Sequence, residues 1–318
     1  MTVGVGRTAL LVAAARAIET HRPDALAHDP LAEHFVRAAP VSARWPVHPD
    51  GVPDGEADPL WGRLGRYFGL RTRVLDDHLL RSARAGVRQV VLLGAGLDAR
   101  AFRLDWPAGC TVHEIDTEGV LTFKQEVLDR TCARPAAARR TIPADLRGDW
   151  VGALIRAGFE RTVPTAWLAE GLLLYLPADA EQRLMACVHA LSAPGSTLAY
   201  ELKEVVAESA AVRNAPVYLA ARQRLGIDLP ALFATGRRPD TAAELAARGW
   251  TVAVHTPYEF TVLHGRGPLP EPDDALAANR WVLAERARPT PLPAGRASVS
   301  CAPGRIAGRE PPLRLAAQ

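Results

Sequence analysis

Lysine is nearly absent from this chain of 318 residues, because Lys124 and Lys203 are the only lysines among its 38 basic residues. Long apolar runs are absent too. Apolar runs such as Ala9 to Ala15 and Gly171 to Leu176 fall far short of the roughly 18 residues that cross a bilayer. The net charge is only +3, and no basic face of the kind that binds nucleic acid is evident. We therefore expect neither a membrane nor a nucleic acid partner.

Cysteines are few and are not paired. Cys110, Cys132, Cys187 and Cys301 form no CxxC motif and lie near no histidine at metal-ligand spacing. In a chain of this length they do not make a disulfide framework, and we expect buried free thiols and no metal.

Composition is that of a globular protein, with 48% hydrophobic and 23% charged residues. Three regions differ along the chain. Residues 1–85 read as an N-terminal helical cap with an irregular proline-rich loop near 40–59, and residues 86–287 as the core, with a helical insertion at about 204–248. Residues 288–318 are rich in proline and arginine, and we expect this tail to lack order.

The N-terminal segment has two interpretations. Apolar residues after Arg7, with Ala15-Arg-Ala17 following, resemble a short signal peptide. The apolar stretch is short, however, and Arg16 and Glu19 follow at once. We favour an amphipathic helix from Thr8 to about Thr20 and hence expect a cytoplasmic protein.

The core alternates apolar strand patterns with helical patterns. The expected strands are Gln89–Leu93, Thr111–Ile115, a weak third at Arg140–Ala144, then Thr165–Ala169, Thr197–Leu202, Trp250–His255 and Arg280–Glu285. Such alternation predicts an α/β fold with a mostly parallel, doubly wound sheet. Ligands of these sheets bind beyond the carboxyl ends of the strands.

Two features at the strand ends indicate a nucleoside-binding site. The first strand runs into Gly94-Ala-Gly-Leu-Asp-Ala99, a glycine-rich turn of the G-x-G-x-x-A type. Asp116 ends the second strand, at the distance where an acid binds a ribose diol. The turn alone is weak evidence, since ordinary strand-to-loop turns also carry glycine.

Four acids follow four strands: Asp98, Asp116, Asp145 and Glu170. Asp98 within the turn would repel a pyrophosphate but tolerate an ammonium or a sulfonium. This favours a cationic cofactor, S-adenosylmethionine, over a dinucleotide. Taken singly, each acid is also consistent with a helix cap or a solvated loop residue.

The segment Gln89-Val-Val-Leu-Leu-Gly-Ala-Gly-Leu-Asp-Ala-Arg-Ala-Phe-Arg-Leu104 resembles the signature of the leucine carboxyl methyltransferase-like family. It is most similar to the bacterial branch of S-adenosylmethionine-dependent O-methyltransferases, which includes polyketide carboxyl methyltransferases. Further matching motifs lie between about residues 6 and 205: Asp29-Pro-Leu-Ala32, Arg71-Thr72, His113-Glu-Ile-Asp116, Asp145-Leu-Arg147 and Trp167-Leu-Ala-Glu-Gly-Leu-Leu173.

The resemblance implies a class I methyltransferase fold, a Rossmann-like seven-stranded sheet whose extra N-terminal and inserted helices form a lid. It also implies roles for individual residues. The cofactor-binding candidates are Arg71 for the methionine carboxylate (with Arg73 as the alternative), Gly94, Ala95, Gly96 and Asp98 in the turn, Asp116 for the ribose, Asp145 and Leu146 for the adenine, and Glu170 for the methionine.

The expected activity is methylation of a carboxylate or hydroxyl of a small molecule, as in polyketide-type biosynthesis. A protein C-terminal carboxyl methyltransferase and, from another class, a nicotinamide-dependent oxidoreductase remain as alternatives. No catalytic residue is evident. The weak candidates for a general base are Tyr175, His255 and Tyr258. The sequence identifies neither the acceptor nor the oligomeric state.

Overall fold

A computed structural model of the chain describes residues 5–204, 213–271 and 274–288. The expected order of the tail after Arg288 lies outside these residues. The strands, in chain order, are β1 (Gln89–Leu93), β2 (Thr111–Asp116), β3 (Ala138–Pro143), β4 (Thr165–Ala169), β5 (Thr197–Lys203), β6 (Trp250–His255) and β7 (Asn279–Arg286). All seven predicted strands are present, although β3 begins two residues earlier than expected.

The strands form one sheet in the order β3-β2-β1-β4-β5-β7-β6. The first five are parallel, and β7 runs antiparallel between β5 and β6. Strand order reverses between β1 and β4, which is where an open sheet of this kind binds its ligand. The predicted seven-stranded α/β fold is confirmed.

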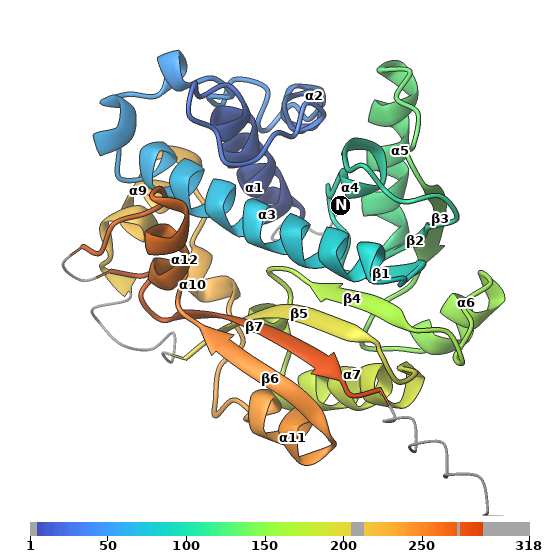
Figure 1. Cartoon of the computed structure of the whole chain (residues 1–318). Helices are drawn as coiled ribbons and strands as arrows, with labels where there is room; N and C mark the ends of the chain where they lie inside the picture. The colour runs from blue at the N-terminus through green and yellow to red at the C-terminus, as the bar shows by residue number, and fades with distance from the viewer. Residues whose placement is uncertain (1–4, 205–212, 272–273, 289–318) are drawn as a thin grey trace, which may run out of the picture. The chain divides into compact units, whose positions relative to one another are not determined.

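Helices cover both faces of the sheet (Figure 1). The helices are α1 (Val5–Thr20), α2 (Ala32–Ala38), α3 (Trp61–Arg84), α4 (Arg100–Arg103), α5 (Glu118–Arg130), α6 (Trp150–Arg156), α7 (Ala178–Leu191), α9 (Pro216–Leu225), α10 (Leu229–Leu232), α11 (Thr241–Ala247) and α12 (Pro257–His264). Short 3₁₀ helices are η1 (Pro49–Gly51), η2 (Gly55–Ala57) and η3 (Leu173–Tyr175). Two of these, η1 and η2, lie in the proline-rich loop that we expected to hold no regular element.

Strand β1 shows why the sequence folds into layers. All five of its residues are buried. Val90 and Leu92 pack with α3 residues such as Leu79, whereas Val91 and Leu93 belong to the core on the α6 and α7 side. An uninterrupted apolar run is what a strand between two helical layers requires, because successive side chains point to opposite faces.

Helix α1 is confirmed, but the amphipathic pattern expected for it is not. Its residues from Leu10 to Glu19 are buried with one partial exception, Val12, so no face of that stretch is solvated. Helix α1 packs against α2 and α3 and also borders the cavity described below. A helix enclosed on all sides needs small residues, which explains Ala13, Ala14, Ala15 and Ala17.

His78 of α3 supplies a pH-dependent term in stability. It is buried, and burial, helped by Arg81, lowers its pKa to about 4. In the unfolded chain its pKa is near 6.5. As pH falls from about 6.5 to 4, the unfolded chain therefore gains a proton that the folded chain does not, and stability falls. At pH 5 we expect a loss of roughly 2 kcal/mol from this residue.

Urea unfolding at pH 7 and pH 5 measures this term. The wild-type protein should lose about 2 kcal/mol more between the two pH values than the His78→Phe variant, because other groups titrate equally in both. An equal loss in the two proteins would show that His78 does not carry the effect.

Candidate functional site

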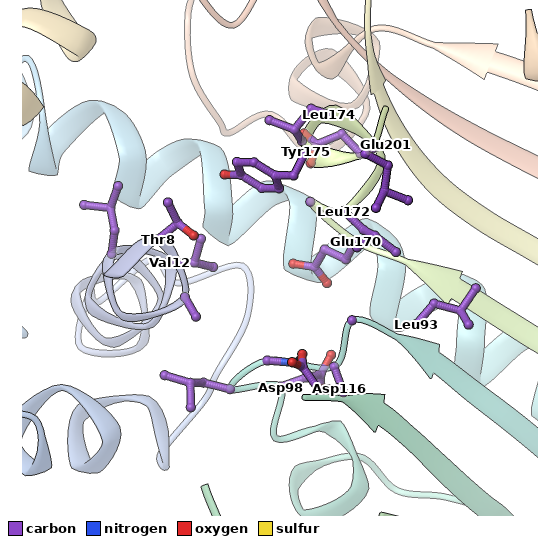
Figure 2. A pocket seen from close by; sticks show the side chains of 18 of the residues that line it. Thr8, Val12, Leu93, Asp98, Asp116, Glu170, Leu172, Leu174, Tyr175 and Glu201 are labelled. Atoms are coloured by element: carbon purple, nitrogen blue, oxygen red, sulfur yellow. The ribbon is translucent and has the colours of Figure 1, made fainter. Parts of the chain in front are cut away.

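A cavity of about 440 Å³ lies at the carboxyl ends of β1, β2, β4 and β5. Helix α1 and the segment around η3 border it, and Figure 2 shows Thr8 and Val12 of α1 facing Glu170 and Tyr175. Its size is in the range of small-molecule sites. The cavity therefore occupies the position where the sequence predicted the ligand.

The glycine turn after β1 forms one wall of the cavity. Gly94 and Gly96 have φ values of +66° and +48°, in the left-handed region that favours glycine. A Cβ built on Gly94 would lie 3.0 Å from Cδ1 of Leu172, another wall residue. Glycine here keeps both the backbone conformation and the space beside Leu172, so a ligand can approach the main chain.

Asp116, at the end of β2, is tied to this turn. Its Oδ2 accepts a hydrogen bond from the Gly96 N–H at 2.7 Å, and its Oδ1 accepts one from the Thr117 N–H at 2.7 Å. The Thr117 hydroxyl donates a third, longer bond to Oδ1 at 3.3 Å. Of about four acceptor positions on a carboxylate, one is therefore open, and a second opens when the Thr117 hydroxyl gives way to a ligand hydroxyl. This chemistry fits a ribose diol.

Three acidic residues of the site, Asp98, Glu170 and Glu201, belong to a continuous series of ion pairs that sequence reasoning did not anticipate. Its links run Glu201–Arg71 (2.6 Å), Arg71–Glu170 (2.8 Å), Glu170–Arg100 (2.6 Å), Arg100–Asp76 (2.6 Å), Asp76–Arg103 (2.6 Å), Arg103–Asp29 (3.9 Å) and Asp29–Arg16 (2.9 Å), with Asp98 also paired to Arg100. The series connects α1, α3 and α4 with the ends of β4 and β5.

The arginines hold these acids in their charged forms. Burial alone would raise the pKa of Glu170, but Arg100 and Arg71 outweigh burial and keep its pKa well below the usual range. Likewise burial opposes and Arg100 favours the charged form of Asp98, whose pKa is lowered. Both carboxylates are therefore ionised at any physiological pH.

These ion pairs correct the prediction that four unpaired acids at the strand ends would favour a cationic cofactor. Asp98 and Glu170 are neutralised by arginine, and Asp145 pairs with Arg147 at 2.6 Å. Within the described residues Asp116 alone of the four lacks an arginine partner. Negative charge at the strand ends is thus largely balanced, and it does not by itself select a cationic cofactor.

The structure brings together all the first-choice candidates for binding the cofactor. All of them line the cavity: Arg71, Gly94, Ala95, Gly96, Asp98, Asp116, Asp145, Leu146 and Glu170. Arg73, the alternative to Arg71, instead pairs on the exposed surface with Asp77. The individual roles remain predictions.

Of the three candidate bases, only Tyr175 lines the cavity. Burial raises its pKa to about 12, partly offset by a hydrogen bond with Thr8, so it is a protonated phenol at neutral pH. His255 pairs with Glu259, four residues along the chain. The Tyr258 hydroxyl forms hydrogen bonds with Asp274 and Arg63. Neither His255 nor Tyr258 borders the cavity, because β6 is the edge strand remote from the β1–β4 reversal.

Several wall residues were missed by sequence reasoning. Glu201 and Lys203 project from the end of β5, while Tyr67, Phe68 and Phe233 give the wall an apolar, aromatic part. Glu201 lies at the carboxyl end of a strand, as the other acids do, and could have been predicted from that position. The aromatic residues come from α3 and from the region after α10, and no local motif marks them.

The sequence model of the leucine carboxyl methyltransferase family matches residues 9–189. A Streptomyces coelicolor protein named as a putative S-adenosyl-L-methionine-dependent methyltransferase is 64% identical over 287 residues, 90% of this chain and 94% of its own. A protein of the same description from Saccharopolyspora erythraea is 45% identical over 284 residues, 89% and 96% of the two chains.

This chain belongs to the leucine carboxyl methyltransferase family, and the resemblance predicted from its motifs is confirmed. The names of the relatives agree with the expected cofactor. Among solved structures, a methyltransferase described as putative from Thermobifida fusca aligns with a TM-score of 0.48 at 19% identity, covering 80% of this chain and 94% of its own.

In the part of the chain that the structure describes, no helix has the length and apolarity to cross a membrane. The same residues contain no cluster of three or more histidine, cysteine, aspartate or glutamate side chains placed to hold a metal ion.

Proposed function

We propose that this protein transfers a methyl group from S-adenosylmethionine to a carboxylate or hydroxyl oxygen of a small acceptor, in secondary-metabolite biosynthesis of the polyketide type. Its family makes it an S-adenosylmethionine-dependent methyltransferase; the oxygen nucleophile and the acceptor class are the proposal. The observation that carries it is one cavity in which the Gly94–Gly96 turn and Asp116 meet an aromatic wall.

The residues present fit the cofactor. Asp116 would bind the ribose hydroxyls, and Gly94 and Gly96 would let the ligand lie against the main chain. Arg71 gives its Nη atoms to Glu170 and Glu201, but its buried Nε has no hydrogen-bond partner among the described residues. A guanidinium has five N–H donors, so these two contacts leave donors for the methionine carboxylate, as proposed for this arginine.

Bound cofactor would supply a methyl group on a sulfonium, and the protein would hold an acceptor oxygen in line with it. Transfer would form the O–C bond and break the S–C bond, leaving S-adenosylhomocysteine. Fixing this geometry can contribute roughly 7–11 kcal/mol to lowering the barrier. An ionised carboxylate needs no base, whereas a phenol with a pKa of about 10 benefits from one. Because Tyr175 is itself protonated, the site favours an acceptor that arrives as an anion.

The aromatic part of the wall supports a small acceptor. Tyr67, Phe68, Tyr218 and Phe233 border the cavity together with several leucines. The alternative, methylation of a protein C-terminal carboxylate, is tested by labelled methyl transfer to leucine-ended peptides beside small organic acids. Transfer to peptides alone would overturn the small-molecule assignment.

Asp116→Ala should weaken binding of S-adenosylmethionine by at least tenfold, because two charge-assisted hydrogen bonds to the ribose are lost. Isothermal titration with S-adenosylmethionine, S-adenosylhomocysteine and NAD measures this directly. The wild-type protein should bind the two adenosyl ligands and not NAD.

Asp179→Ala is the matched control, since Asp179 pairs with Arg183 on the exposed side of α7 and is absent from the cavity wall. It should leave the affinity unchanged. Thermal unfolding of both variants shows that the fold persists. Equal affinity of Asp116→Ala and wild type would remove the ribose assignment, and binding of NAD alone would contradict the methyltransferase site.

A further inference from the structure

The last residue of β5 places a cation in the cavity wall. Lys203 lies two residues after Glu201, so both side chains project from the same face of the strand. Lys203 is opposite Asn279 of β7 in the ladder, and Glu201 is opposite Trp281. All four therefore share one face. Figure 2 shows Glu201 and Tyr175 across the cavity from Asp98 and Asp116. Lys203 borders the same cavity.

The ammonium of Lys203 has only neutral partners. Its Nζ donates to the Ala275 carbonyl oxygen at 2.5 Å and to Oδ1 of Asn279 at 3.0 Å. An ammonium has three N–H donors, so one remains. No carboxylate within the described residues forms an ion pair with Lys203, and the neighbouring Glu201 is already engaged by Arg71 and Tyr67.

Neighbouring side chains hold Lys203 in place. Asn279, which accepts one of its hydrogen bonds, donates through Nδ2 to the Tyr67 hydroxyl at 2.7 Å. The Tyr218 and Phe233 rings lie 5.8 and 6.0 Å from Nζ, and these two rings contact each other. The cation thus lies over these two aromatic rings.

No carboxylate of the described residues contacts the ammonium of Lys203 directly. Burial lowers its pKa to about 8, with the charges of Glu201 and Asp274 opposing the shift, so it is still mainly protonated at pH 7. The arginines that border this cavity, Arg16, Arg71 and Arg147, are each paired with an acid. An anionic ligand would supply the missing partner and use the free N–H.

We propose that Lys203 determines acceptor specificity by binding an anionic group of an acceptor whose body is flat and apolar. The anion completes the hydrogen bonds of the ammonium, and the apolar body packs on Tyr218 and Phe233. This inference rests on the proposed function, because it assigns the second half of the same cavity. If Lys203 has this role, the protein should bind acids more tightly than neutral molecules of the same shape.

Calorimetry on the protein saturated with S-adenosylhomocysteine tests the preference. The probes are benzoate, 2-naphthoate, 4-biphenylcarboxylate and decanoate, each with its neutral amide. We expect at least one acid to bind wild type at least tenfold more tightly than its amide. Lys203→Met should abolish that preference, and Lys203→Arg should retain part of it.

Arg280→Met is the control, because Arg280 neighbours Asn279 but pairs with Glu204 and lies outside the cavity wall. It should keep the preference intact. Unchanged affinity for S-adenosylhomocysteine in every variant shows an intact fold, and Lys203→Gln replaces Lys203→Met if the latter does not fold.

Two results would overturn the assignment of Lys203 alone: no acid preferred over its amide in wild type, or a preference that survives Lys203→Met. Failure of wild type to bind S-adenosylhomocysteine would instead overturn the proposed function and the inference with it.

Discussion

Replacing Arg100 by methionine should lower the free energy of unfolding by about 3–5 kcal/mol. Arg100 is only 1% exposed and pairs with Asp76, Asp98 and Glu170. Methionine fills similar space without charge, so three largely buried carboxylates lose a positively charged partner. Breaking a buried ion pair from one side is costly for this reason, even where the intact pair contributes little.

Urea denaturation of Arg100→Met and of Arg73→Met separates this effect from a general loss of arginine. Arg73 pairs with Asp77 on the exposed face of α3, and its removal should cost at most about 1 kcal/mol. Similar losses of unfolding free energy in the two variants would mean that the buried ion pairs contribute no more to stability than an exposed pair. A near-neutral Arg100→Met would mean that Asp98 and Glu170 find other partners or take up protons.

The network also shows where prediction from sequence stopped. The four acids were found because each follows a strand, and strands are visible as apolar runs. Their pairing with arginine was not. The resemblance named Arg71 only for the cofactor, and neither Arg71 nor Arg100 carries a local pattern that marks it as a partner of these acids. Whether an arginine neutralises a site depends on how α3 and α4 pack, which is set by tertiary contacts.

Strand position was easier to predict than strand order. β1 and β4, which are buried on both faces, were located to the residue. β3 is mostly exposed, with an interrupted apolar pattern, and its start was misplaced. The antiparallel insertion of β7 between β5 and β6 leaves no local signal. It matters for function nonetheless, because it brings Asn279 beside Lys203.

Two of the three candidate bases, His255 and Tyr258, lie outside the cavity wall for a related reason. His255 and Tyr258 were considered because they follow a strand, but β6 is the edge strand of the sheet. Distance along the chain from a strand end is informative only for strands next to the reversal in strand order. Glu201 and Lys203 satisfy that condition through β5, which adjoins β4.

Gly94→Ala should weaken binding of S-adenosylmethionine by at least tenfold while the protein remains folded. Two effects combine at this residue. An L residue at φ +66° costs about 1 kcal/mol or more in backbone strain. In addition, the new methyl group would lie 3.0 Å from Leu172 Cδ1, so either the turn or Leu172 must move within the cavity wall.

The Gly86→Ala variant separates the effect of backbone strain from the effect of a methyl group that intrudes on the cavity wall. Gly86 has φ +102°, and a Cβ there meets nothing within 4 Å; it is also absent from the cavity wall. Both variants should unfold at lower urea concentration than wild type, yet only Gly94→Ala should lose cofactor affinity in calorimetry. If both kept wild-type affinity, the ligand would not approach the main chain at Gly94. If Gly86→Ala lost affinity as well, the effect would come from general destabilisation, and the glycine turn would have no separate part in binding.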